Sequence, residues 1–443
     1  MRVLIQFRSS PVLHRAARAA TPALAVTASV QQTVPGLIVD AAFPPVQIPT
    51  PKVSEPGVNA LAMHQPREFS LKPEESTYLV RGSIPDADIH DAVAAATAQP
   101  SVVGVFSDPT IESTLICPGS PPLGTAGTVA GLLKVPALAR RGLTGRGVML
   151  AIVDTGISLP YLQTQGVKLT LDVARSWTPS GVPTTPGNHP KNHGTMCAYD
   201  AAIAASQAMF LDYAVLLTRK TGQTVMSGQL SDAVVAYSKL LTMLRALPPA
   251  KRRMVVSNSW GMFDPAWDFP VGHPGNYSDN AAHPFNIIVA SLEHAGADIL
   301  FAAGNCGRNC PDGRCRFGRT RPICGANSHP AVLSVAGIDT KRNRVGYSSQ
   351  GPGRLSKQKP DICGYTHFRG SLVYPDDGGT SAACPVVAGV VAAVRTKHSF
   401  AQLDPSQLRA LIFKTAKDLG GTGFDYDYGW GVIEPGALMA ALP

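Results

Sequence analysis

Four short segments of the chain hold side chains that could together catalyse acyl transfer. Asp154 ends the apolar run AIVD, and His193 begins the segment HGTMC. Asn305 ends the run DILFAAGN, and Ser381 lies in GGTS just before a stretch of small residues. A carboxylate can orient an imidazole, the imidazole can take a proton from a hydroxyl, and the hydroxyl can then attack a carbonyl carbon. Because a side-chain amide can bind the negative oxygen that forms, the four residues fit nucleophilic hydrolysis.

Each of these residues also has a simpler interpretation. Asp154 could cap a turn, Asn305 could be a turn residue, and Ser381 could be a helix N-cap. A single histidine such as His193 is more often a packed or surface side chain than a catalyst. The four segments together are far more specific, because each supplies a group that the same reaction needs.

The segments that must position these residues alternate between two patterns. From residue 148 onward, apolar β-branched runs such as VMLAIV, RMVVSNS and AVLSVAG alternate with Ala-rich stretches that predict helices, among them 230–247, 281–295 and a long helix after Ser381. Such alternation predicts an α/β fold, a mostly parallel sheet with helices on both faces. Asp154 and Asn305 would then lie at the carboxyl ends of two strands.

Residues 1–113 predict a separate small α+β domain of ferredoxin-like type. Strand and helix patterns alternate in the order βαββαβ, with strands at 2–7, 37–42, 77–82 and 101–106, helices at 11–20 and 86–98, and a Pro-rich loop at 44–56. Residues 114–146, rich in Pro, Gly and Thr, are interpreted as a linker with one helix at 135–141. Residues 147–443 form the second domain, which holds all four candidate residues.

The candidate segments resemble the signature segments of a known family. DTG at 154–156, HGT at 193–195, AAGN at 302–305 and GTSxAxP at 379–385 are similar to those of the subtilisin-like serine proteases, the subtilase or peptidase S8 family. The order Asp, His, Ser is the subtilisin order, which differs from the chymotrypsin and α/β-hydrolase orders. SNSWG at 257–261 and YGWGVIEPGAL at 428–438 extend the resemblance over nearly all of the second domain.

The resemblance implies a serine endopeptidase that acts on proteins or peptides and needs no cofactor for catalysis. Asp154, His193 and Ser381 would be its triad, and Asn305 its oxyanion-hole side chain. The substrate would pair in extended form with Ser259, Trp260 and Gly261, and its P1 side chain would contact Ala302, Ala303 and Gly304. Structural calcium is frequent in the family, but the sequence assigns no residue to such a site.

The resemblance also implies a role for the first domain. It resembles the family's propeptide, an intramolecular chaperone and inhibitor, so we expect self-cleavage near Leu115 and inhibition by the released domain. Two other function classes stay open. One is a catalytically silent protein that binds peptides, and the other is a serine hydrolase that cleaves esters or joins peptides.

The cysteines allow several interpretations. Cys306, Cys310, Cys315 and Cys324 lie in one Arg-rich insertion directly after Asn305. They could bind a structural zinc ion, although CxxC pairs are missing, or they could form two disulfides. Cys197, four residues after His193, is either a thiol close to the catalytic histidine or a small buried hydrophobic residue.

Composition excludes some other functions. The formal net charge is +9, but Lys and Arg are scattered, so we expect no nucleic-acid partner. The longest apolar run, Val386 to Val394, is half the length that a membrane span needs. The N-terminus MRVLIQFRSSP has no signal-peptide pattern, so we expect a cytoplasmic protein, with secretion as the alternative if the start is mis-assigned or export is non-classical.

Overall fold

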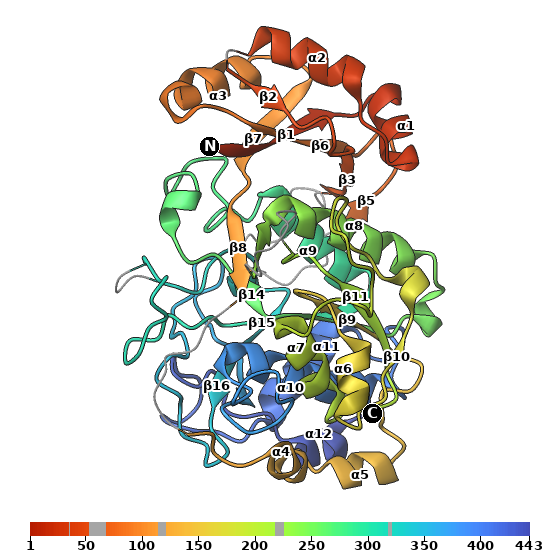
Figure 1. The fold of residues 1–443 in the computed structure, drawn as a ribbon, viewed down its shortest axis with the longest axis vertical. Coiled ribbons are helices and arrows are strands. Elements are labelled where there is room, and N and C mark those ends of the chain that lie inside the picture. The colour runs from red at the N-terminus through yellow and green to blue at the C-terminus, as the bar shows by residue number, and fades with distance from the viewer. Residues whose placement is uncertain (35, 53–67, 114–120, 218–225, 318–320) are drawn as a thin grey trace, which may run out of the picture.

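The computed structural model describes residues 1–34, 36–52, 68–113, 121–217, 226–317 and 321–443. It divides into a small N-terminal body and a larger α/β body, which lie at opposite ends of the long axis in Figure 1. Within the described residues, no helix is long and apolar enough to cross a membrane.

The N-terminal body is built on an antiparallel sheet with the order β2-β6-β1-β7. Its strands are β1 (Arg2–Arg8), β2 (Ile38–Val39), β6 (Thr77–Ser83) and β7 (Val102–Ser107), and a further strand, β3 (Val46–Ile48), also pairs with β6. Three helices cover the sheet face that points away from the larger body, α1 (Pro11–Ala19), α2 (Leu24–Thr33) and α3 (Ile89–Thr97) (Figure 1). The predicted mixed α and β composition of this body is confirmed.

Two predictions for the N-terminal body were wrong. The strand predicted at 37–42 is only Ile38–Val39, and helix α2, which precedes it, was missed because no side chain caps its N-terminus at Ala23. The loop predicted at 44–56 contains β3 and also β4 (Thr50–Lys52), which pairs with β5 (Glu68–Ser70). These strands of three residues depend on their pairing partners rather than on their own sequence pattern.

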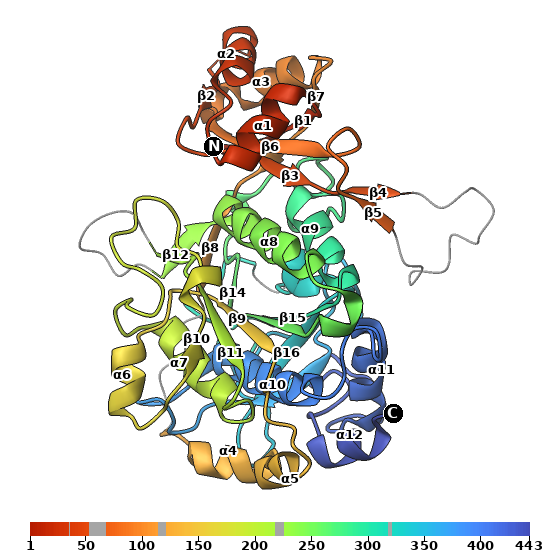
Figure 2. The ribbon, with the colours of Figure 1, turned by 90° about the vertical axis from the view of Figure 1, so that its right-hand side faces the viewer.

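The larger body contains the predicted parallel sheet. Its strand order is β10-β11-β9-β13-β15-β16-β17, and every pair is parallel. The strands are β9 (Met149–Val153), β10 (Thr170–Leu171), β11 (Met209–Tyr213), β13 (Met254–Asn258), β15 (Ala297–Ala302), β16 (Leu333–Ile338) and β17 (Ile362–Tyr365). Figure 2 shows helices on both faces, with α7 (His193–Ala202) and α10 (Gly379–Arg395) on one and α8 (Leu230–Arg245) and α9 (Pro284–His294) on the other.

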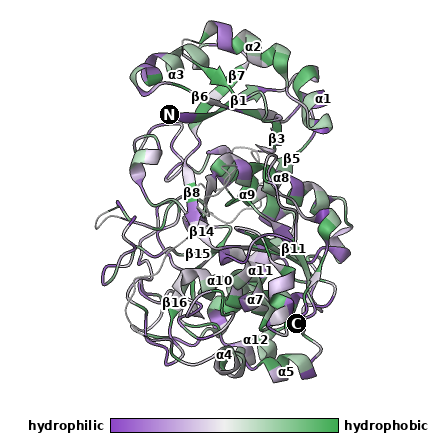
Figure 3. Ribbon diagram, viewed as in Figure 1, coloured by the Kyte–Doolittle hydropathy of each residue, from purple (hydrophilic) through white to green (hydrophobic). Residues whose placement is uncertain are grey.

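Helix α10 is the central element of this body. All of its residues are buried, and most of its length is hydrophobic (Figure 3). It lies against α7 at Gly389, where a β-carbon would come within 2.3 Å of the Ala201 carbonyl oxygen. At its last residue, Arg395 donates to both carboxylate oxygens of Asp298 in β15, at 2.5 and 2.7 Å. A buried charge needs such a partner, so this ion pair fixes α10 against the strand that precedes Asn305.

Most of the predicted linker is a packed part of the larger body. Residues 114–120 lie outside the described residues, but 126–140 form two helices, α4 (Ala126–Leu132) and α5 (Val135–Arg140). Val129 and Leu133 are buried in the same core as α7 and α10, and Leu138 packs against Ala393 of α10. Burial of these apolar side chains explains why Gly and Thr in this segment do not make it a flexible connection. The described residues of this body also form the α-helices α6 (Leu159–Thr164), α11 (Pro405–Thr415) and α12 (Pro435–Ala441).

One strand of the N-terminal part leaves its own sheet and enters the larger body. β8 (Thr110–Ser113) forms a three-stranded antiparallel sheet between β12 (Ser227–Gln229) and β14 (Trp260–Gly261). This strand lies between the two bodies in Figure 1. The first domain is therefore connected to the second by backbone pairing as well as by the chain itself.

Candidate active site

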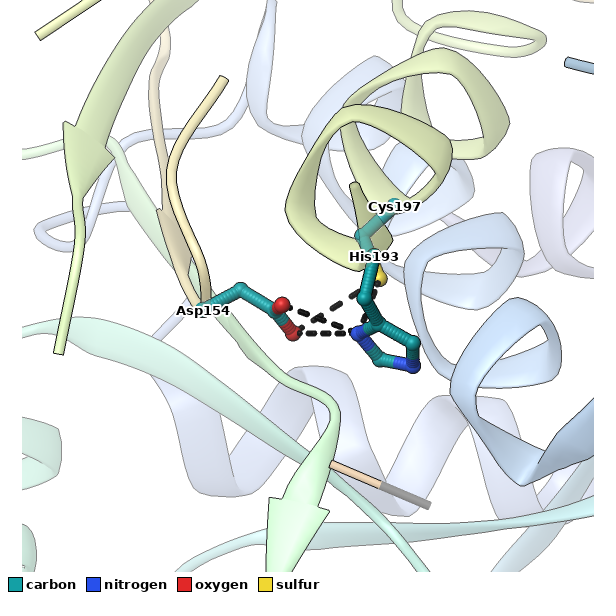
Figure 4. A group of neighbouring side chains, drawn as sticks. All are labelled: Asp154, His193 and Cys197. Carbon is teal, nitrogen blue, oxygen red and sulfur yellow. Dashed lines mark hydrogen bonds and ion pairs between the residues drawn. The ribbon is translucent and has the colours of Figure 1, made fainter. Parts of the chain in front are cut away.

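Asp154 and His193 form a buried pair at the carboxyl end of the sheet. Asp154 follows β9, and His193 is the first residue of α7. The Nδ1 atom of His193 lies 2.9 and 3.0 Å from the two carboxylate oxygens of Asp154 (Figure 4). Both side chains are almost fully buried, at 3% and 1% exposure. The carboxylate therefore fixes the orientation and the tautomer of the imidazole, whose Nε2 atom points away from it.

Hydrogen bonds and a close backbone approach join the turn after Asp154 to the start of α7. The Asp154 carboxylate accepts from the Thr155 backbone N–H at 2.7 Å, and the Thr155 hydroxyl accepts from the Gly194 N–H at 2.8 Å. A β-carbon at Gly194 would lie 2.6 Å from the Gly156 carbonyl oxygen. Only glycine at position 194 lets the start of α7 approach the turn after Asp154 this closely.

Ser381 lies in the first turn of α10, next to the same pair. The thiol of Cys197 is 3.8 Å from His193 Nδ1 and 3.6 Å from the Ser381 carbonyl oxygen, so one small side chain separates the histidine from the serine backbone. The Ser381 hydroxyl is 3.4 Å from the Ser259 carbonyl oxygen. His193 Nε2 has no hydrogen-bond partner among the described residues. Ser381 and His193 Nε2 are therefore not joined by a hydrogen bond in this structure, and such a catalytic bond often forms only in the complex with substrate.

Asn305 is held by the residue before Ser381. Its side-chain oxygen accepts from the Thr380 backbone N–H and from the Thr380 hydroxyl, each at 2.9 Å. The same hydroxyl accepts from the Gly304 N–H at 3.1 Å. With its oxygen fixed in this way, the amide presents its NH₂ group on the other side, as an oxyanion donor requires.

The predicted substrate-binding strand is already paired with an extended segment. Trp260 and Gly261 pair with Ser113 and Glu112 of β8. The other edge of β8 pairs with β12. Ser259 is connected to the nucleophile, because its hydroxyl donates to the Ser381 carbonyl oxygen at 2.9 Å. The Trp260 side chain points into the core and donates to the Val153 carbonyl oxygen, so only its backbone is available to a substrate.

Two of the three predicted P1 wall residues line a small pocket beside β14. The pocket is lined by Gly261, Ala303 and Gly304 together with Met262, Phe263, Cys306, Pro322, Cys324, Asn327 and Ser349. The third, Ala302, is not among the lining residues and is fully buried in β15. Asn327, which the sequence did not single out, donates to the carbonyl oxygens of Trp260 and Ala302 and so joins the two walls.

The four clustered cysteines do not form one site. Cys306 and Cys315 are joined by a disulfide, Cys310 is also disulfide-bonded, and Cys324 is a buried free thiol. A zinc site of four thiolates is therefore wrong, and so is the pairing of all four with one another. The spacing of the cysteines could not reveal this, because pairing depends on where the loop folds back.

Cys197 is buried among the active-site groups. Burial raises the pKa of its thiol well above the usual value, so it stays protonated and donates to the Asp154 carboxylate at 3.8 Å. Within the described residues, Asp154, His193 and Cys197 are the one group of three potential metal ligands, with ligand atoms within 4.8 Å of one another. The Cys197 thiol is thus both buried and close to His193, so the structure agrees with both interpretations of this residue.

The fold and the site together define a class of protein. A parallel α/β sheet that brings an Asp-His pair, a serine in the first turn of a helix and an oriented amide to one edge is the framework of a serine hydrolase. Residues 145–431 match the family model described as Subtilase family, so the chain belongs to the subtilase family.

Individual relatives are similar over the same region. M-protease of Shouchella clausii (strain KSM-K16) is 29% identical over 311 residues, which is 68% of this chain and 66% of that protein. Subtilisin Savinase of Lederbergia lenta is 28% identical over 68% of this chain and 94% of its own length. Subtilisin E of Bacillus subtilis (strain 168) is 26% identical over 68% of each chain. The chain thus spans just under two thirds of the length of M-protease.

Thr380 offers a test of the geometry around Asn305. Thr380→Val should remove the hydroxyl that holds the Asn305 oxygen, so the amide should lose its alignment and kcat should fall by about 10-fold with little change in KM. Asn305→Ala should lose more, about 10²–10³-fold in kcat. Steady-state kinetics on a peptide substrate would measure both. Thr380→Ser keeps the hydroxyl and should stay close to wild type. A larger effect on KM than on kcat would mean that these residues bind the substrate instead.

Proposed function

We propose that the protein is a serine endopeptidase that hydrolyses peptide bonds with Ser381 as nucleophile, His193 as general base and Asp154 as the group that orients it. The observation that supports this most strongly is the position of β8. This extended segment is paired with β12 on one edge and with β14 on the other. Its pairing with β14 begins at Trp260, the residue after Ser259, and Ser259 contacts the Ser381 hydroxyl. A polypeptide substrate would bind in the same way.

In the proposed reaction, side chains and backbone groups of the protein act in each step. Ser381 Oγ attacks the substrate carbonyl carbon as His193 Nε2 takes its proton, and the histidine later gives this proton to the leaving amine. The Asn305 amide and the Ser381 backbone N–H, in the first turn of α10, bind the negative oxygen of the tetrahedral intermediate. Water then attacks the acyl group on Ser381, with His193 again as base, and releases the acid product.

The two alternative functions are less well supported. Burial of the Asp154 carboxylate and the His193 imidazole costs free energy of folding. A protein that only binds peptides would gain nothing from this buried pair in return. A hydrolase of small esters would not need two strands that pair with an extended backbone. A casein assay separates the first alternative from a protease, and product analysis separates the second.

Loss of the nucleophile is the direct test of this proposal. Ser381→Ala should remove peptide hydrolysis, by about 10⁶-fold in kcat, the size of the effect for subtilisin. Hydrolysis of casein or a fluorogenic peptide would be measured beside wild type, with circular dichroism to check folding. More than about a hundredth of wild-type turnover in the variant would contradict the assignment of Ser381.

We further propose that residues 1–113 inhibit the active site. Their last strand takes the substrate position, and the rest of the domain contacts α8 through buried polar groups. Asp108 accepts from the Ser231 N–H and hydroxyl at 2.8 and 3.0 Å, and Arg81 donates to Asp232 at 3.3 Å. A segment held by a whole docked domain loses little further entropy when it is ordered, so it should stay bound even after the chain is cut.

Self-cleavage is the expected fate of the connection. We predict that wild type converts to two fragments with a cut near Leu115, a position outside the described residues, and that Ser381→Ala stays intact. Gel electrophoresis and N-terminal sequencing over time would follow the conversion. Added residues 1–113 should then inhibit the mature enzyme at micromolar concentration or below. Full activity of an uncut chain, or no inhibition by the added domain, would mean that the domain has another role.

The interface contains a histidine that should make docking depend on pH. His283 Nδ1 accepts from the Phe285 N–H at 3.2 Å, which leaves Nε2–H to donate to the Ser107 carbonyl oxygen at 3.1 Å. This arrangement requires the neutral ring, and burial lowers the pKa of His283 to about 4. Burial also raises the pKa of Asp108. This carboxyl group therefore favours docking as pH falls, which is opposite to the effect of His283.

The histidine contribution can be isolated by substitution. Above pH 6.5 His283 is neutral in both states, and below it only the undocked state gains a proton, so its contribution to docking is lost as pH falls toward 4. The inhibition constant of residues 1–113 should therefore rise as pH falls from about 6.5 toward 5. His283→Gln keeps a donor for Ser107 and should remove this part of the pH dependence. The same pH profile for both proteins would show that His283 is not responsible.

A further inference from the structure

An arginine on the insertion after Asn305 contacts the segment that lies in the substrate position. Arg314 Nη1 donates to the Glu112 carboxylate at 2.7 Å, and Nη2 donates to the Ser113 carbonyl oxygen at 2.6 Å. Both acceptors belong to β8. The first contact depends on the side chain of the bound segment, whereas the second would form with any residue, because it uses the backbone.

The larger body holds this arginine in place by itself. Asp312 accepts from Arg314 Nε and Nη2 at 3.2 and 2.8 Å, so one edge of the guanidinium group is paired inside the loop and the other edge faces β8. The group also lies 4.5 Å from the centre of the Phe263 ring. A planar guanidinium that is fixed on one edge and on one face is oriented to bind a carboxylate with the remaining edge.

The loop that carries Arg314 is connected to the oxyanion residue. The disulfide Cys306–Cys315 joins the residue after Asn305 to the residue after Arg314. The Asn305 carbonyl oxygen also accepts from the Asp312 N–H at 2.8 Å. Arg314 is therefore positioned relative to the catalytic groups rather than relative to the N-terminal domain.

We propose that Arg314 is a specificity-determining residue that selects substrates with an acidic side chain at the position taken by Glu112. This inference rests on the proposed function, because it treats β8 as a substrate analogue. Arg314 and Glu112 are 28% and 16% exposed, so the pair is shielded enough to contribute more than a surface ion pair does. A substrate that lacks the carboxylate would leave Nη1 without its charged acceptor while keeping the backbone contact.

Peptide substrates that copy residues 108–116 test this directly. Three peptides would carry Glu, Gln or Lys at the position of Glu112, and the purified protein would be used after its N-terminal domain has been released. Wild type should cleave the Glu peptide at least 10-fold better in kcat/KM than the Gln peptide and at least 100-fold better than the Lys peptide, mainly through KM. Mass spectrometry of the products would check that the same bond is cut.

Two variants and one control identify the residue responsible. Arg314→Met should cleave the Glu and Gln peptides equally, and Arg314→Glu should prefer the Lys peptide, a gain that a misfolded protein could not show. Arg316→Met is the matched control, because Arg316 lies two residues away and, among the described residues, its Nη1 donates to the Gly313 carbonyl oxygen within the loop and not to β8. It should keep the wild-type preference.

The full chain provides a second measurement. Glu112→Lys should slow self-cleavage, and the addition of Arg314→Glu should restore it. Equal cleavage of all three peptides by wild type, or an unchanged preference in Arg314→Met, would overturn the role of Arg314 but not the proposed function. If wild type cleaves neither these peptides nor casein, the proposed function fails, and this inference fails with it.

Discussion

The paired position between β12 and β14 is the constraint on which the site and the domain arrangement both depend. Backbone N–H and C=O groups at a strand edge need partners, and these two short strands are not paired with each other but both pair with β8. Any chain that fills this position must be extended and must lie in register with β14. Since Ser259, which precedes β14, is hydrogen-bonded to the Ser381 backbone, register along the strand determines which peptide bond meets the nucleophile. The same constraint determines the position of the N-terminal body, because β8 begins three residues after the end of β7, the last strand of that body's sheet.

Close packing of small residues keeps the reacting groups in place. His193 and Ser381 lie in the first turns of two helices that approach each other closely, and the absence of a β-carbon at Gly389 allows that approach. Gly194 does the same between His193 and the turn after Asp154. A triad whose members come from three different elements has the right geometry only if those elements cannot shift, and a β-carbon at either glycine would force a displacement of whole helices.

The sequence predicted the parallel sheet and the order of the site residues, but not the parts of the structure that depend on partners. Long apolar runs such as the one before Asp154 report burial directly, so they were placed correctly. The short strands β3, β4 and β8 carry no such pattern, since three or four residues become a strand only when an edge is available. For the same reason the interpretation of 114–146 as a linker missed α4, whose Val129 is buried in the core that also contains α7 and α10 rather than by its own segment. The Cys306–Cys315 pairing and the contact of Arg314 with β8 required the path of the loop, which spacing does not give.

In the proposed self-cleavage, the same contacts would have opposite consequences before and after the cut. While the chain is intact, pairing of β8 and the Arg314–Glu112 ion pair would bring a peptide bond to Ser381 and favour its hydrolysis. After the proposed hydrolysis these contacts would remain, because they involve residues on the N-terminal side of the cut, and the fragment would then compete with every other substrate. Release must therefore be governed by groups outside the substrate strand. Asp108 and His283 are such groups, since both lie in the docked interface and both have pKa values that burial has moved. On these proposals, specificity and activation would be controlled at two different places, the first by the loop beside Asn305 and the second by the surface around α8 and α9, so that either could change without loss of the other.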